Sequence, residues 1–139
     1  MDTNVFISSF FGGIPRQIID YWFSGKLILC VSRSILKEYF EVLGRFQFHR
    51  DDLHRRLVMA FEKGANLLFV NNPKEQNWIG DDPGDNKFIA CALSLHAKYI
   101  VSGDSHLKNE RGVGGVKIVP PRKMLELVSL KLMETLRIK

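Results

Sequence analysis

The chain has 139 residues, of which 45% are hydrophobic and 25% charged, with a formal net charge of +5. This composition predicts a single globular domain over residues 1–139, and neither a membrane-spanning run nor a secretory signal is present in the sequence. We therefore expect a cytoplasmic protein without membrane contact. The basic balance favours a polyanionic partner, although a solvated basic surface explains the same charge equally well.

Short apolar runs alternate with longer helical patterns. The runs rich in Ile, Leu and Val predict buried strands at 26–31, 66–70, 98–103 and 116–120. Helices are predicted at about 14–24, 33–45, 50–63, 84–95 and from about 121 onward. This alternation predicts an α/β fold with a parallel sheet, in which functional residues lie beyond the carboxyl ends of the strands.

The first half of the chain holds candidate acids in two places: Asp2 near its start, and Glu38 and Glu41 on a predicted helix. Asp2 and Asn4 precede an apolar run in "MDTNVFISSFF", where a frayed terminus is a sufficient explanation for a lone Asp2. On the helix predicted at 33–45, the apolar arc includes Ile35, Tyr39 and Phe40. Glu38 falls about 40° outside that arc and Glu41 near the middle of the polar face. Glu41 is therefore predicted to be solvated, and Glu38 to lie at the border of the core.

The stretch "GDDPGDNKFIACALSLHAKYIVSGD" holds the remaining candidates. Asp82 before Pro83 is a good helix start. Asp85 could also serve that helix terminus, but it shares the face of Phe88 and Ile89, which should turn toward the sheet. Asp104 directly follows a predicted strand, where a turn or a helix cap is the competing explanation.

The two cysteines and the last helix are largely apolar in their surroundings. Cys30 and Cys91 lie in apolar runs without a CxxC motif, so they are predicted to be buried free thiols. The helix from about 121 carries an apolar stripe that is too wide for one packed face. It either covers a second subunit, which would make a homodimer, or frays at its end.

Four segments together resemble the PIN domain, a nuclease fold of the Rossmann-like, three-layer α/β/α type. They are "DTNVFISS" with Asp2, "VSRSILKEYFEVLGR" with Glu38, "DPGDNKFIACAL" with Asp85 and "AKYIVSGDSHL" with Asp104. Their order and spacing are similar to those of prokaryotic proteins regarded as toxins of toxin–antitoxin pairs. The resemblance covers nearly the whole chain, and it implies that the four acids converge at the strand ends.

The resemblance implies a metal-dependent endoribonuclease that hydrolyses RNA with metal-activated water. Asp2, Glu38, Asp85 and Asp104 would be the catalytic residues and would hold Mg²⁺ or Mn²⁺, since hard cations take oxygen ligands. Asn4 and Ser102 would orient these ligands through hydrogen bonds. The implied partners are RNA and a small antitoxin protein. The alternative function is a PIN-like module that has lost catalysis and binds RNA or protein.

Two departures from the family pattern bear on these expectations. Only Met1 precedes Asp2, so the first, central strand is predicted to be truncated here: either the true start lies upstream or the domain has lost its middle strand. His106 stands where relatives often carry another acid, although a surface histidine is the simpler explanation. An aspartyl-phosphate phosphatase ranks low, because its second aspartate is replaced by Asn4.

Overall fold

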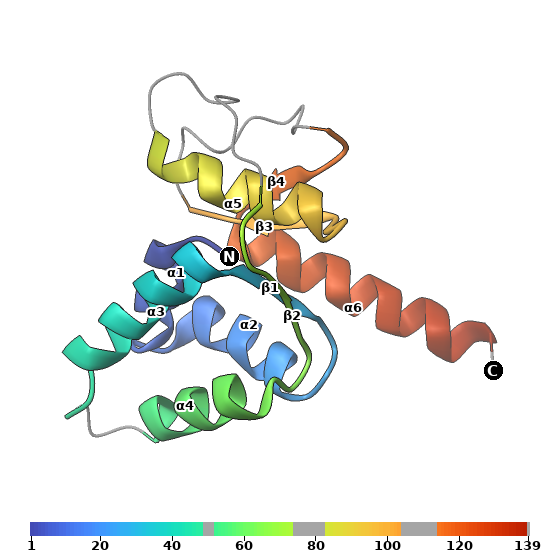
Figure 1. The fold of residues 1–139 in the computed structure, drawn as a ribbon. Helices are drawn as coiled ribbons and strands as arrows, with labels where there is room; N and C mark the ends of the chain where they lie inside the picture. The colour runs from blue at the N-terminus through green and yellow to red at the C-terminus, as the bar shows by residue number, and fades with distance from the viewer. Residues whose placement is uncertain (49–51, 74–82, 104–113, 139) are drawn as a thin grey trace.

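The computed structural model describes residues 1–48, 52–73, 83–103 and 114–138, with the backbone alone at 83–85 and 134–138. Along the chain (Figure 1) the elements are α1 (Thr3–Ser9), α2 (Gly13–Phe23), β1 (Leu29–Ser32), α3 (Arg33–Arg45), α4 (Leu53–Lys63), β2 (Leu67–Val70), α5 (Pro83–Ser94), β3 (Tyr99–Val101), β4 (Lys117–Val119) and α6 (Pro121–Ile138). The predicted α/β fold with parallel strands is confirmed.

The strands form two parallel pairs in the described part of the chain, where the sequence predicted one sheet. β1 pairs with β2 from Leu29↔Leu67 to Ser32↔Val70, and β3 pairs with β4 from Tyr99↔Lys117 to Val101↔Val119. Between the pairs, the backbone N–H of Asp2 donates to the carbonyl oxygen of Val101 at 2.9 Å. Asp2 therefore forms a single backbone hydrogen bond with β3, in addition to the pairing of β3 with β4.

An apolar cavity lies between the two strand pairs. Its lining includes Leu29 and Cys30 of β1, Ile100 and Val101 of β3, and Met1 at the start of the chain. The cavity volume is about 70 Å³. We call this cavity the inter-sheet slot. It occupies the place where a strand between β1 and β3 would join both pairs into one sheet.

Helix α1 was not expected from the sequence, and aromatic packing explains its position. The ring of Phe6 stacks on Tyr39 of α3 with centroids 4.3 Å apart, and Phe10 stacks on Phe46 at 4.5 Å. Offset-stacked rings add to the stabilisation that burial provides. These contacts fix α1 against α3, and they thereby bring the first residues of the chain next to the middle of α3.

Several predictions of burial need correction: Ile28 and Leu68, in segments predicted to be buried strands, are 59% and 45% exposed. Phe40 of α3 is 51% exposed and Phe69 of β2 is 50% exposed, although both were expected to face the core. β2 has one strand partner among the described strands, so it forms an edge that is open on its far side. Cys30 is only half-buried, whereas Cys91 is buried as predicted, and both are free thiols.

Helix α6 packs against α2 along its first half. Tyr21 of α2 and Ser129 of α6 lie within hydrogen-bonding distance, with their hydroxyl oxygens 3.4 Å apart. The second half projects away from the other elements (Figure 1), and it exposes Leu130, Leu132 and Met133. Within the described ranges, no helix is long and apolar enough to cross a membrane.

Candidate functional site

The candidate site lies at the carboxyl ends of β1 and β3. Ser32 ends β1 and opens α3, and its buried side chain accepts a hydrogen bond from the N–H of Ile35. Beyond the end of β3, the N–H of Ser102 donates to the carbonyl oxygen of Val119 at 2.9 Å, which continues the strand pairing. In an α/β sheet this edge is the usual place for a ligand.

Asp2 is the best fixed carboxylate of the site. Its side chain is 5% exposed, and its Oδ1 accepts a hydrogen bond from the N–H of Val5 at 2.9 Å, which caps helix α1. Its Oδ2 accepts a hydrogen bond from the hydroxyl of Ser102. Each oxygen keeps a further lone pair, so these contacts orient the carboxylate without closing it to a cation.

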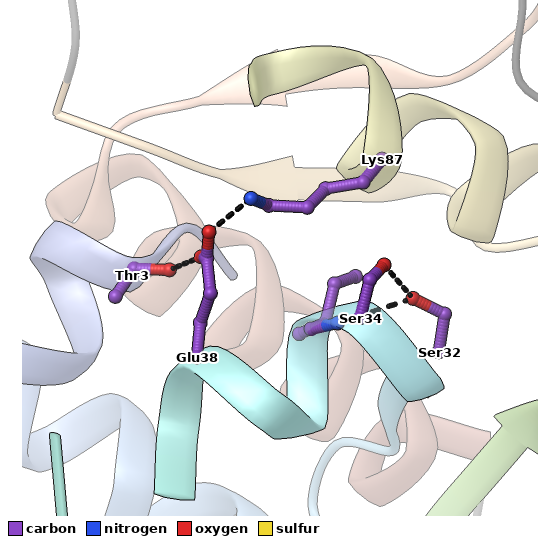
Figure 2. Close-up of polar contacts among 6 residues, drawn as sticks. Thr3, Ser32, Ser34, Glu38 and Lys87 are labelled. Carbon is purple, nitrogen blue, oxygen red and sulfur yellow. Dashed lines mark hydrogen bonds and ion pairs between the residues drawn. The ribbon is translucent and has the colours of Figure 1, made fainter. Parts of the chain in front are cut away.

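Glu38 is the second carboxylate, and it lies between two donors (Figure 2). The hydroxyl of Thr3, next to Asp2 in the chain, donates to Oε2. The ammonium of Lys87 on α5 forms an ion pair with Oε1, and both side chains are largely shielded from water. The site thus joins α1, α3 and α5 around one acid.

Buried groups surround the two acids. Burial raises the pKa of Tyr39 well above its usual range, so its hydroxyl keeps the proton that it donates to the carbonyl of Met1. Burial lowers the pKa of the Met1 α-amino group, and the charge of Asp2 opposes that shift. A desolvated amine is therefore held close to a carboxylate at the same point.

The donor set fits a hard divalent cation. Carboxylate oxygens are the ligands that Mg²⁺ and Mn²⁺ accept, and Glu38 already has a cationic group, Lys87, against one oxygen. Among the described residues, no group of three or more acids, histidines or cysteines surrounds a common point. Asp2 and Glu38 are the two predicted ligands whose side chains the structure describes, and Thr3, the residue after Asp2, contacts Glu38.

The other predicted site residues have different outcomes. Ser102 contacts Asp2 directly. Asn4 is exposed on α1, and no hydrogen bond among the described residues joins it to Asp2 or Glu38. Asp85 lies in the first turn of α5, with its side chain outside the described part of the structure. Asp104 lies outside the described residues, as do Asp82 and His106.

Helical phase separates the two glutamates of α3 as predicted, since Glu41 is exposed while Glu38 is half-buried and paired. Two contacts were missed: Thr3 and Lys87. Lys87 stands two positions after Asp85 in "DNKF", within the stretch that holds the candidate acids. A basic residue at that distance from a candidate ligand is a sequence signal for an ion pair at the site.

Comparison with known proteins agrees with this geometry. A family model described as PIN domain matches residues 1–106. The chain is 34% identical over 113 residues to the uncharacterized protein MJ1680 of Methanocaldococcus jannaschii, covering 77% of this chain and 70% of that protein. No solved structure matches the chain. PIN domains have a nuclease-type fold and are typically metal-dependent ribonucleases. The chain belongs to the PIN domain family.

Proposed function

We propose that this protein is a metal-dependent endoribonuclease. The observation that carries the proposal is that Asp2 and Glu38 are both held by donors of the protein beyond the strand ends. The hydroxyl of Thr3, the residue after Asp2, donates to Glu38, and the Lys87 ammonium pairs with Glu38. A carboxylate that attracts a cation at this edge of an α/β fold suits the binding of a metal and a phosphodiester.

In this proposal Asp2, Glu38, Asp85 and Asp104 hold Mg²⁺ or Mn²⁺. The bound ion supplies Lewis acidity at the phosphodiester. The chain's own residues orient the ligands: Ser102 and the N–H of Val5 fix the rotation of the Asp2 carboxylate, and Thr3 positions Glu38. Asn4, which is exposed on α1, is proposed to orient a ligand from the solvent side.

The partners are proposed from surface chemistry. RNA fits the net charge of +5, and a cytoplasmic location gives access to it. We further propose that the protein is the toxin of a toxin–antitoxin pair, whose small antitoxin blocks the site. The exposed Leu130, Leu132 and Met133 of α6 support a homodimer. Sedimentation should then show a dimer that Leu130→Lys weakens.

A second function is favoured by one specific observation. Both oxygens of Asp2 accept hydrogen bonds from protein donors, and Lys87 neutralises Glu38. A site whose acids are satisfied internally suits a PIN-like module that binds RNA or protein without cleaving it. The two functions differ in whether these acids exchange their present partners for a metal.

Incubation with a mixed RNA pool tests the proposal. We expect endonucleolytic fragments with Mn²⁺ or Mg²⁺ and none after addition of a chelator. The Glu38→Gln variant serves as the matched control for a contaminating nuclease, because it should lose cleavage while it stays folded. RNA binding without cleavage at any metal concentration would support the non-catalytic module instead.

A further inference from the structure

A surface groove lies between α3 and the end of β2. It is lined by Arg33, Leu36, Lys37 and Phe40 of α3 together with Phe69 and Asn71. Its volume is about 730 Å³, and it is shallow and open to solvent. We call it the α3–β2 groove. None of its residues belongs to the predicted set of metal ligands.

Two aromatic rings in the groove are exposed to an unusual degree. Phe40 is 51% exposed and Phe69 is 50% exposed. Phe40 is nevertheless held in place, because Phe61 contacts it in a T-shaped arrangement with ring centroids 5.7 Å apart. Apolar patches that are rimmed by polar residues often mark binding sites. Nucleobases stack on such faces without regard to sequence.

The cations of the groove follow the spacing of a helix face. Arg33 and Lys37 are four residues apart and both are exposed, and Phe40 follows three residues later, so they form one stripe along α3. Glu41 also lines the groove and offsets one of the two positive charges. The remaining balance is positive, and it lies next to aromatic faces.

The groove lies at the carboxyl edge of β1 and β2. Ser32 and Val70 are paired in register at the ends of β1 and β2, so Arg33 and Asn71 follow at the same carboxyl edge. Glu38 comes directly after Lys37 on α3 but lies about 100° further around the helix, so it faces α1 and α5 and not the groove. The groove and the carboxylate site therefore lie at the same edge of the strands, on different faces of α3.

We propose that the α3–β2 groove binds single-stranded RNA, with bases stacked on Phe40 and Phe69 and phosphates paired with Arg33 and Lys37. The occupant is single-stranded because paired bases in a duplex do not offer their faces to side chains. RNA is favoured over an acidic peptide because bases can stack on the half-exposed rings of the groove while phosphates meet its cations. The proposal rests on the proposed ribonuclease function, and it names a surface that would hold the substrate.

Binding is tested in the presence of a chelator, so that cleavage plays no part. The measurement is fluorescence anisotropy of a labelled, unstructured RNA oligonucleotide with Phe40→Leu and Phe69→Leu, which keep apolar bulk and remove the ring. We expect binding about fivefold weaker for each variant. Phe48→Leu is the matched control, since Phe48 is 89% exposed and lies outside the groove; it should bind like the unmodified protein.

A salt titration tests the cations separately. Lys37→Gln should lower the magnitude of the slope of log affinity against log salt by about 0.7, the value for one phosphate contact on a single strand. Lys63→Gln, at an exposed position outside the groove, should leave the slope unchanged.

Three results would overturn the groove proposal: groove variants that bind like Phe48→Leu, equal affinity for a duplex of the same sequence, or variants that lose a protein partner while they keep RNA. Failure of the proposed function has a different signature. Groove-dependent binding with no cleavage in Mn²⁺ would refute the ribonuclease and leave the groove standing. If the unmodified protein cleaves RNA but the groove variants bind RNA as tightly as it does, the groove proposal is refuted and the ribonuclease stands.

Discussion

At the scale of single residues, the function of Glu38 depends on which way α3 turns it. Glu38 faces α1 and α5, where Thr3 and Lys87 contact it, while Glu41 faces solvent at the edge of the α3–β2 groove. The two acids are three residues apart on one helix and have the same chemistry. Their environments alone distinguish them, so they form a natural pair for comparison.

Glu38→Gln should abolish metal-dependent RNA cleavage, whereas Glu41→Gln should leave the rate within a few-fold. The amide keeps the hydrogen bond from Thr3 but removes the charge that attracts a cation. Either change should alter stability by no more than about 1 kcal/mol, because both positions are at least partly exposed. Cleavage rates and thermal unfolding of the two variants check this. Equal losses of activity, or a larger loss for Glu41→Gln, would contradict the assignment.

Lys87 should compete with the metal for Glu38. Its ammonium contacts Oε1, so a divalent ion must displace it or share the carboxylate. Lys87→Met removes the competing charge, and we expect Mn²⁺ to bind about fivefold more tightly, corresponding to about 1 kcal/mol for a partly shielded pair. Calorimetric titration with Mn²⁺ measures this without reference to activity.

The control for Lys87 is Lys98→Met, at an exposed position on the approach to β3. That variant also removes one positive charge, but it should leave Mn²⁺ affinity unchanged. Weaker Mn²⁺ binding by Lys87→Met would mean that Lys87 organises the site instead of competing for it.

At the scale of elements, periodicity predicted the longer helices well. The pattern at 33–45 matches α3, and the face of Phe88, Ile89 and Ala92 on α5 is buried as expected. Helix α1 was missed because "NVFIS" is rich in β-branched and aromatic residues, which favour strands. Its helical form depends on the Asp2 cap and on Phe6 stacking against Tyr39, and that second contact is far away in sequence.

Periodicity could not predict which neighbouring elements cover each face of a helix or strand. Phe40 and Phe69 have the hydrophobicity of core residues, but the structure leaves each of them half exposed in a groove. In the same way, the acids of the site were found from their positions in the sequence, while the contact of Lys87 with Glu38 depends on how α5 packs near α3. Pairings between distant elements are tertiary information that one sequence does not carry.

Two possible roles of Asp85, at the start of α5, predict opposite changes in melting temperature for Asp85→Asn. If Asp85 only serves the N-terminus of α5, Asp85→Asn loses a charge–dipole interaction of roughly 0.3–1 kcal/mol and lowers the melting temperature. If Asp85 is one of several converging carboxylates, the same change relieves repulsion between like charges. We expect the second result: a higher metal-free melting temperature, a smaller stabilisation by Mn²⁺ and no cleavage.

Thermal unfolding across a Mn²⁺ titration measures both effects of Asp85→Asn at once. Asn86→Asp is not a suitable comparison because Asn86 is buried; Glu41→Gln, which removes a solvated acid elsewhere, is the better control. A lower metal-free melting temperature together with a normal Mn²⁺ response would assign Asp85 to the helix terminus alone.

At the scale of the whole molecule, the main feature is the inter-sheet slot. Among the described strands, β1–β2 and β3–β4 form two separate pairs, and a small apolar cavity lies between them. Cys91 lines this cavity, and burial raises its pKa to about 12. The α-amino group of Met1 is buried near the same place.

A variant extended before Met1 by about five branched apolar residues, the length of an ordinary strand, should fill the slot. A strand that runs into Met1 would pair with β1 and β3, and a central strand buries side chains on both faces. After the cost of ordering the added residues, we expect a net gain of about 2 kcal/mol, seen as a melting temperature higher by roughly 5 °C or more. Alkylation of the half-buried Cys30, which lines the slot, should also become slower.

An extension of equal length made of Gly and Ser is the matched control. Both extensions convert the buried α-amino group of Met1 into a peptide bond, so both remove the same desolvated charge. Only the apolar one can fill the slot, and the difference between the two melting temperatures therefore measures the strand itself. Equal gains would assign the stabilisation to the lost charge. No gain from either extension would show that β1 and β3 do not accept a strand between them.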